Sequence, residues 1–129
     1  MTVFFKKYYL SILVALIIVW LSLTDSDSIN PSMIFRMPNS DKVAHLLAYG
    51  GFAFVLLFDS CNHKINGKIR YPVLLIPVVF GLVLEILQYL VTKTRQADLF
   101  DFAADVGGVA ACLLFVYALR AVIPAREKS

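Results

Sequence analysis

The residues best able to do chemistry fall into three short polar sets, each at the edge of a strongly apolar segment. In the last set, Asp98, Asp101 and Asp105 are spaced i, i+3 and i+7, so they share one face of a helix. Arg95 precedes them. Carboxylates beside a cation can bind ions, accept hydrogen bonds or transfer protons. Acids that run into a membrane-length apolar segment are costly, so they require a structural or functional reason.

The other two sets carry the remaining candidate side chains. Asp41, His45 and Tyr49 are spaced i, i+4 and i+8 and share a helical face, with Lys42 adding a cation. The third set is Glu85 and Gln88, which are three residues apart and also share one face of a helix. The candidate site is therefore Asp41, Lys42, His45, Tyr49, Glu85, Gln88, Arg95, Asp98, Asp101 and Asp105.

The composition predicts that these sets lie in a membrane protein. The chain has 129 residues, of which 60% are hydrophobic and 16% are charged, and its mean hydropathy is +0.77. A soluble domain is usually nearer half apolar and a quarter charged. The apolar residues fall in four blocks, as in an integral membrane protein. The net charge of +3 is too modest to indicate a nucleic-acid partner and is better explained by membrane orientation.

The predicted fold is one all-α domain over residues 1–129, an integral membrane four-helix bundle. The first block is interpreted as a retained helix, because no small-residue cleavage site follows it as in a signal peptide. Residues 59–70 are predicted to form a polar loop. Pro77 should kink or loosen the third helix, and Gly108 should allow close packing of the fourth. The predicted helices span residues 4–24, 41–58, 71–91 and 99–123.

The distribution of basic residues predicts that both termini are cytoplasmic. Eight of the twelve Lys and Arg residues lie on the side of the termini and four on the other side. At 1.5 Å per residue, Glu85 lies about 21 Å from the cytoplasmic end of its helix. Asp41 and Asp98 begin their helices at the outer face. Tyr49 lies about 12 Å along the helix from Asp41, and Asp105 lies about 10 Å along the helix from Asp98. The three polar faces are therefore expected to meet in the outer third of the bilayer.

Three interpretations of this convergence are open. In the first, it is a structural network in which Arg95 pairs with Asp98 or Glu85 and Lys42 pairs with Asp101. Tyr49 and Gln88 would then form hydrogen bonds between helices. In the second, Lys42 and Arg95 bind the anionic headgroup of a lipid-linked or amphiphilic ligand. The third is catalysis or metal binding by one histidine and its carboxylates. The sequence lacks HExxH, GxSxG and two-histidine metal spacing, so we expect no cofactor and no metal.

The order and spacing of these residues resemble those of a known family. Residues 41–49 fit D-K-x-x-H-x-x-x-Y, residues 85–88 fit E-x-x-Q, and residues 95–101 fit R-x-x-D-x-x-D, followed by Gly107 and Gly108. Over about residues 41–112 the chain resembles the VanZ-like family of small bacterial membrane proteins. Asp105 departs from the pattern, because the family commonly has Asn there.

The resemblance implies a bacterial inner-membrane protein that is tied to the cell envelope. The family takes its name from a protein associated with resistance to the glycopeptide teicoplanin, so the resemblance also suggests a link to glycopeptide tolerance. It supplies no biochemical activity. The leading expectation is a protein that binds an anionic or amphiphilic envelope ligand, such as a lipid-linked precursor or a glycopeptide. The alternatives are an enzyme acting on a lipid-linked substrate, with His45 as acid–base, and a structural or assembly protein.

Overall fold

The described residues of the protein are almost all helical. The computed structural model describes residues 1–24, 40–61, 72–92 and 98–123, and within these ranges it contains no strand. The prediction of an all-α fold is confirmed for this part of the chain. The elements are α1 (Thr2–Lys7), α2 (Tyr9–Leu23), α3 (Ser40–Cys61), a short 3-10 helix η3 (Pro72–Leu74), α4 (Leu75–Val91) and α5 (Leu99–Val122).

Three of these helices are long and apolar enough to cross a membrane. They cover Ser40–Ser60, Pro72–Val91 and Leu99–Val122. The apolar helix α2 has 15 residues and is therefore about 22 Å long, which is shorter than the roughly 30 Å hydrocarbon core of a bilayer. These lengths and compositions are consistent with a membrane protein, as predicted.

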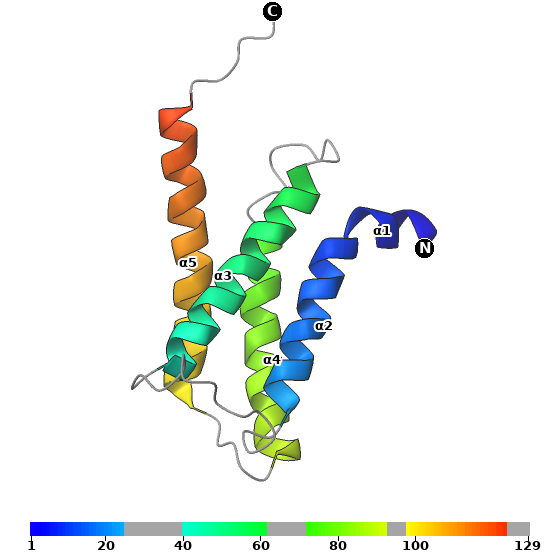
Figure 1. The fold of residues 1–129 in the computed structure, drawn as a ribbon, viewed down its shortest axis with the longest axis vertical. Helices are drawn as coiled ribbons and strands as arrows, with labels where there is room; N and C mark the ends of the chain where they lie inside the picture. The colour runs from blue at the N-terminus through cyan, green and yellow to red at the C-terminus, as the bar shows by residue number, and fades with distance from the viewer. Residues whose placement is uncertain (25–39, 62–71, 93–97, 124–129) are drawn as a thin grey trace, which may run out of the picture.

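Helices α2 to α5 lie side by side and alternate in direction, whereas α1 turns away from the others (Figure 1). The predicted first helix is therefore two helices, divided at Tyr8, whose φ of −113° and ψ of 24° are not helical. Because the directions alternate, α3 and α5 begin at the same end of the molecule at which α2 and α4 finish (Figure 1). Polar residues near these four helix ends are thereby brought to one end of the bundle.

Helices α3 and α5 approach each other closely. Gly50 and Gly108 face each other there, backbone against backbone. A β-carbon on Gly108 would overlap the carbonyl oxygen of Leu46 and lie 2.9 Å from the amide nitrogen of Gly50. Close packing at Gly108, predicted from the small-residue pattern, is thus confirmed, and it is what allows side chains of α3 and α5 to meet.

Helix α4 covers one side of this pair. Phe80 packs edge-on against Phe52 of α3, with ring centroids 5.4 Å apart, and also contacts Tyr49. Pro77 is the third residue of α4. A proline in the first helical turn has no intrahelical hydrogen bond to lose, so α4 continues through it as one helix. Pro77 does not interrupt the helix.

Helix α3 extends further than predicted. It continues to Cys61, so Asp59 and Ser60 are helical and buried instead of lying in a polar loop. Oδ2 of Asp59 accepts hydrogen bonds from the backbone N–H of Ser11 at 3.1 Å and from its hydroxyl at 2.7 Å. Ser11 lies in the first turn of α2, where backbone N–H groups have no partner within the helix. Asp59 supplies that partner, and this stabilises the buried position of its carboxylate.

Candidate functional site

The first turns of α3 and α5 bring a lysine and two aspartates together. Nζ of Lys42 lies 3.3 Å from Oδ2 of Asp98 and 3.6 Å from Oδ1 of Asp101. The predicted pairing of Lys42 with Asp101 is confirmed. Because Lys42 is shared by two carboxylates, its charge is already neutralised within the protein.

One turn further along both helices, His45 meets Asp105. Nδ1 of His45 lies 2.7 Å from Oδ1 of Asp105, which is the shortest polar contact between α3 and α5 in the described residues. Asp105 is completely buried, and the side chain of His45 is 11% exposed. The imidazole is parallel to the ring of Tyr49, with centroids 6.2 Å apart. A carboxylate and an aromatic ring therefore fix the orientation of the histidine.

The other carboxylate oxygen of Asp105 faces α4. Among the described residues, Oδ2 has no hydrogen-bond partner. A β-carbon on Gly81 would lie 2.8 Å from this oxygen and 3.1 Å from Cε1 of Tyr49. Gly81 thus leaves the room that the Asp105 carboxylate occupies. The sequence interpretation gave Gly81 no role, because an isolated glycine in an apolar helix carries no signal of what it faces.

Asp101 completes the surroundings of the imidazole. Its Oδ2 lies 4.0 Å from Nε2 of His45, which is too long for a hydrogen bond. Its Oδ1 is buried and accepts no hydrogen bond from the described residues. Asp41, at the exposed start of α3, can place a carboxylate oxygen near the same two side chains. The histidine is thus flanked by acids on two sides.

Helix α4 adds the remaining two predicted residues. The buried Glu85 accepts a hydrogen bond from the backbone N–H of Asp98 at 3.3 Å, which ties α4 to the start of α5. Nε2 of Gln88 donates to the backbone carbonyl of Ser22 at 2.9 Å. That carbonyl is in the last turn of α2, where carbonyl groups have no partner within the helix. The predicted interhelical hydrogen bond of Gln88 is confirmed.

Within the described residues, the predicted site is an acidic cluster. Arg95 lies outside the described residues, so its predicted partners are not observed. The described part of the site contains five acidic residues, one lysine and one histidine. We define the acidic cluster as Asp41, Lys42, His45, Glu85, Asp98, Asp101 and Asp105.

The second polar site, formed by Asp59 and Ser11, was missed by the sequence interpretation. A signal for it exists. Phe52, Leu56 and Asp59 are spaced i, i+4 and i+7, and all three are buried, so the buried face of α3 runs through Asp59. The prediction missed Asp59 because it ended this helix at residue 58, whereas the periodicity of buried residues continues through Asp59.

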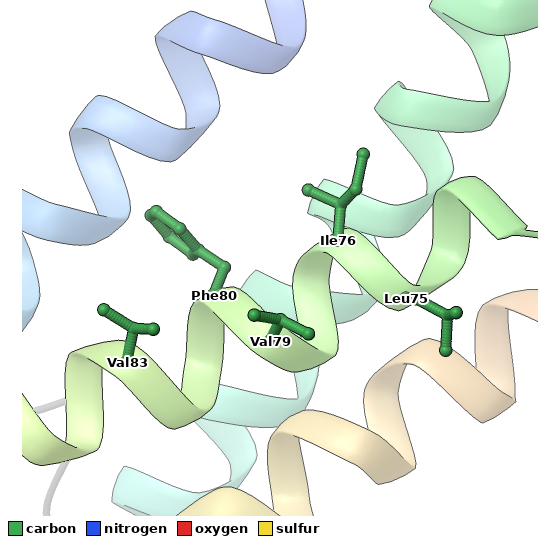
Figure 2. A pocket seen from close by; sticks show the side chains of 5 residues that line it. All are labelled: Leu75, Ile76, Val79, Phe80 and Val83. Atoms are coloured by element: carbon green, nitrogen blue, oxygen red, sulfur yellow. The ribbon is translucent and has the colours of Figure 1, made fainter.

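An apolar groove runs along α4, separate from the acidic cluster. It has a volume of about 400 Å³ and is lined by Leu75, Ile76, Val79, Phe80 and Val83 (Figure 2). No residue of the acidic cluster lines it. In a bilayer such a surface contacts acyl chains, so the groove does not extend the polar site.

Asp98, which lies just before the apolar segment of α5, is expected to make the stability of the protein depend on pH. It is the N-cap of α5 and accepts a hydrogen bond from the N–H of Phe100 at 2.9 Å. This bond, together with Lys42, lowers the pKa of Asp98 from its ordinary value of 3.8. A lowered folded-state pKa contributes stability above the unfolded-state pKa, and this stability is lost as the pH falls through the folded-state pKa.

We therefore expect Asp98→Asn to be less stable than the wild type at pH 7, and the difference to shrink as the pH falls below about 4. Asparagine retains the capping oxygen, so the charge alone is removed. Asp98→Ala removes the cap as well and should stay less stable even in acid. The measurement is the melting temperature in detergent at a series of pH values. Parallel curves for the wild type and Asp98→Asn would contradict the assignment.

Comparison of the chain with protein-family models, with curated proteins and with solved structures finds no match. The resemblance to the VanZ-like family therefore stays a prediction from the residue pattern.

Proposed function

We propose that this chain is a VanZ-like integral membrane protein that binds the polar headgroup of an amphiphilic cell-envelope ligand at its acidic cluster. One observation carries the proposal: buried carboxylates from α4 and α5 lie around His45 at one end of a set of largely apolar helices. Ionisable groups within membrane segments are expensive and usually functional. A headgroup at the membrane surface can reach this end of the bundle, while its acyl chains remain in lipid.

The proposal includes a topology. Four crossings by α2 to α5 return the chain to the side on which it started, and the surplus of basic residues favours the cytoplasm for that side. The bundle is then a four-helix bundle of the inner membrane, and the acidic cluster lies at its outer face. Helix α2 crosses the bilayer as the shortest member, supported by its packing against α3 and α4.

The balance of charges favours a particular headgroup chemistry. Lys42 is engaged by Asp98 and Asp101, so it is poorly placed to attract an anion. The buried Oδ2 of Asp105 has no hydrogen-bond partner among the described residues and can accept a hydrogen bond. The cluster therefore recognises a headgroup that brings N–H or O–H donors, as in an amine or a sugar, in preference to a bare phosphate.

The test uses amphiphiles that differ only in their headgroup. Purified protein in detergent with EDTA is mixed with dodecylamine, dodecyl maltoside or dodecyl phosphate at a low ratio to the detergent, and the melting temperature is measured. We expect dodecylamine or the maltoside to raise the melting temperature of the wild type, and Asp105→Asn to lose most of this rise. Stabilisation by dodecyl phosphate alone, abolished in Lys42→Gln, would replace the proposal with anion binding. Equal responses to all three would leave only a structural network.

A second candidate, an enzyme acting on the same kind of ligand, is favoured by the contact between His45 and Asp105. A histidine whose Nδ1 is held by a carboxylate is a common arrangement for a general base. If this candidate is correct, the protein turns over a lipid-linked precursor, and turnover disappears in His45→Gln while binding of the precursor is retained.

A further inference from the structure

We propose that His45, Glu85 and Asp105 bind one divalent transition-metal ion between α3, α4 and α5. Each of the three residues offers a ligand atom, and these atoms lie within 4.8 Å of one another. Ions such as Zn²⁺ are bound at about 2.0–2.2 Å by imidazole nitrogen and carboxylate oxygen, so small side-chain movements bring all three atoms onto one ion. This site goes beyond headgroup binding and does not depend on it.

An independent observation points to a ligand. Asp105 is completely buried, yet its Oδ2 has no hydrogen-bond partner among the described residues. This oxygen faces the backbone of Gly81, one helical turn before Glu85 on the same side of α4. Burial of a carboxylate oxygen without a partner is costly. A cation held between Asp105 and Glu85 removes that cost.

The charges of the three residues suit a divalent ion. Two carboxylates neutralise a 2+ charge, so the occupied site is neutral in a region of low dielectric. One imidazole with two carboxylates is a mixed nitrogen and oxygen donor set, which suits Zn²⁺, Mn²⁺ or Fe²⁺ better than Ca²⁺ or Mg²⁺. The chemical class of the ligand is therefore a first-row divalent transition metal.

The contact between His45 and Asp105 becomes part of the site. Nδ1 and Oδ1 are 2.7 Å apart. An ion that Asp105 binds through both of its carboxylate oxygens replaces the proton between these two atoms, which then separate to about 3 Å. Nε2 then carries the proton and faces Oδ2 of Asp101, now 4.0 Å away. A carboxylate that accepts the second N–H of a metal-bound histidine orients the ring and raises its basicity.

A second group of possible ligands, Asp41, His45 and Asp101, shares the histidine. Two features disfavour it. Nζ of Lys42 lies 3.6 Å from Oδ1 of Asp101 and repels a further cation there, and Asp41 is exposed to solvent. The two groups predict different variant effects, because Glu85 and Asp105 belong only to the first and Asp41 only to the second.

The experiment measures Zn²⁺ binding to EDTA-stripped protein in detergent by isothermal titration calorimetry, without any added amphiphile. We expect one Zn²⁺ per chain in the wild type and in Asp41→Asn. Glu85→Gln and Asp105→Asn should each weaken binding at least tenfold. Circular dichroism and gel filtration verify that each variant is folded.

Co²⁺ added to the wild type gives a readout that does not depend on any variant folding. We expect visible absorption bands at one equivalent of Co²⁺, and these bands should disappear on addition of excess Zn²⁺. Absence of stoichiometric binding in the wild type would overturn the proposal. Loss of binding in Asp41→Asn with retention in Glu85→Gln would overturn it in favour of the second group. Zn²⁺ binding without any amphiphile response would leave the metal site standing while refuting headgroup binding.

Discussion

Replacing Gly108 with alanine is expected to separate α3 from α5 and to destabilise the protein by about 1–3 kcal/mol or more. The added β-carbon would overlap the carbonyl oxygen of Leu46 and lie 2.9 Å from the amide nitrogen of Gly50. Both neighbours are backbone atoms, so no side chain can rotate away. The measurement is the free energy of unfolding in mixed detergent micelles.

The chain offers matched controls for this prediction. A β-carbon on Gly51 or Gly107 would meet no atom within 4 Å. Alanine also has a better helix propensity than glycine, by about 1 kcal/mol in soluble hosts. Gly51→Ala and Gly107→Ala should therefore be neutral or stabilising, with the opposite sign to Gly108→Ala. If all three variants lose similar stability, close packing at Gly108 is not the cause.

The second large effect is expected at the buried contact between Ser11 and Asp59, at the opposite end of α3 from the acidic cluster. Ser11→Ala removes the hydroxyl that donates to Oδ2 at 2.7 Å, and the backbone N–H remains as a donor. Loss of this buried hydrogen bond should cost about 1–3 kcal/mol. Asp59→Ala should cost at least as much, because it also leaves a first-turn N–H of α2 without its partner.

A double-mutant cycle separates this contact from the general effects of each substitution. If the hydrogen bond is the cause, the double variant Ser11→Ala/Asp59→Ala should be more stable than the sum of the single effects predicts, with a coupling of about 0.5–3 kcal/mol. Simple additivity within experimental error would mean that the two side chains do not interact in the folded protein.

The spacing of polar residues along each helix predicted which of them share a face. Asp41 and His45 lie on one face of α3, and Asp101 and Asp105 lie on one face of α5. The contacts of Lys42 with Asp101 and of His45 with Asp105 follow once the two helices are adjacent. This much was predictable because the periodicity of a helix is fixed by its backbone geometry.

The length of α3 was not predictable in the same way. Asp59 and Ser60 resemble the start of a polar loop, because clusters of Asp, Ser and Asn between apolar segments are typical of loops. In the folded protein they remain helical, because the start of α2 provides hydrogen-bond donors to Asp59. A partner 48 residues away along the chain leaves no trace in local sequence.

Sequence alone determined that the chain is helical and rich in membrane-length segments, and which polar side chains share a face, because composition and periodicity are local properties. Tertiary structure decided how those faces are used. Lys42 forms ion pairs with two aspartates, and Gly81 lies beside the buried oxygen of Asp105. Glu85 accepts a hydrogen bond from the backbone just before α5. These outcomes depend on how closely helices approach and at what rotation, and both are set by packing between distant segments.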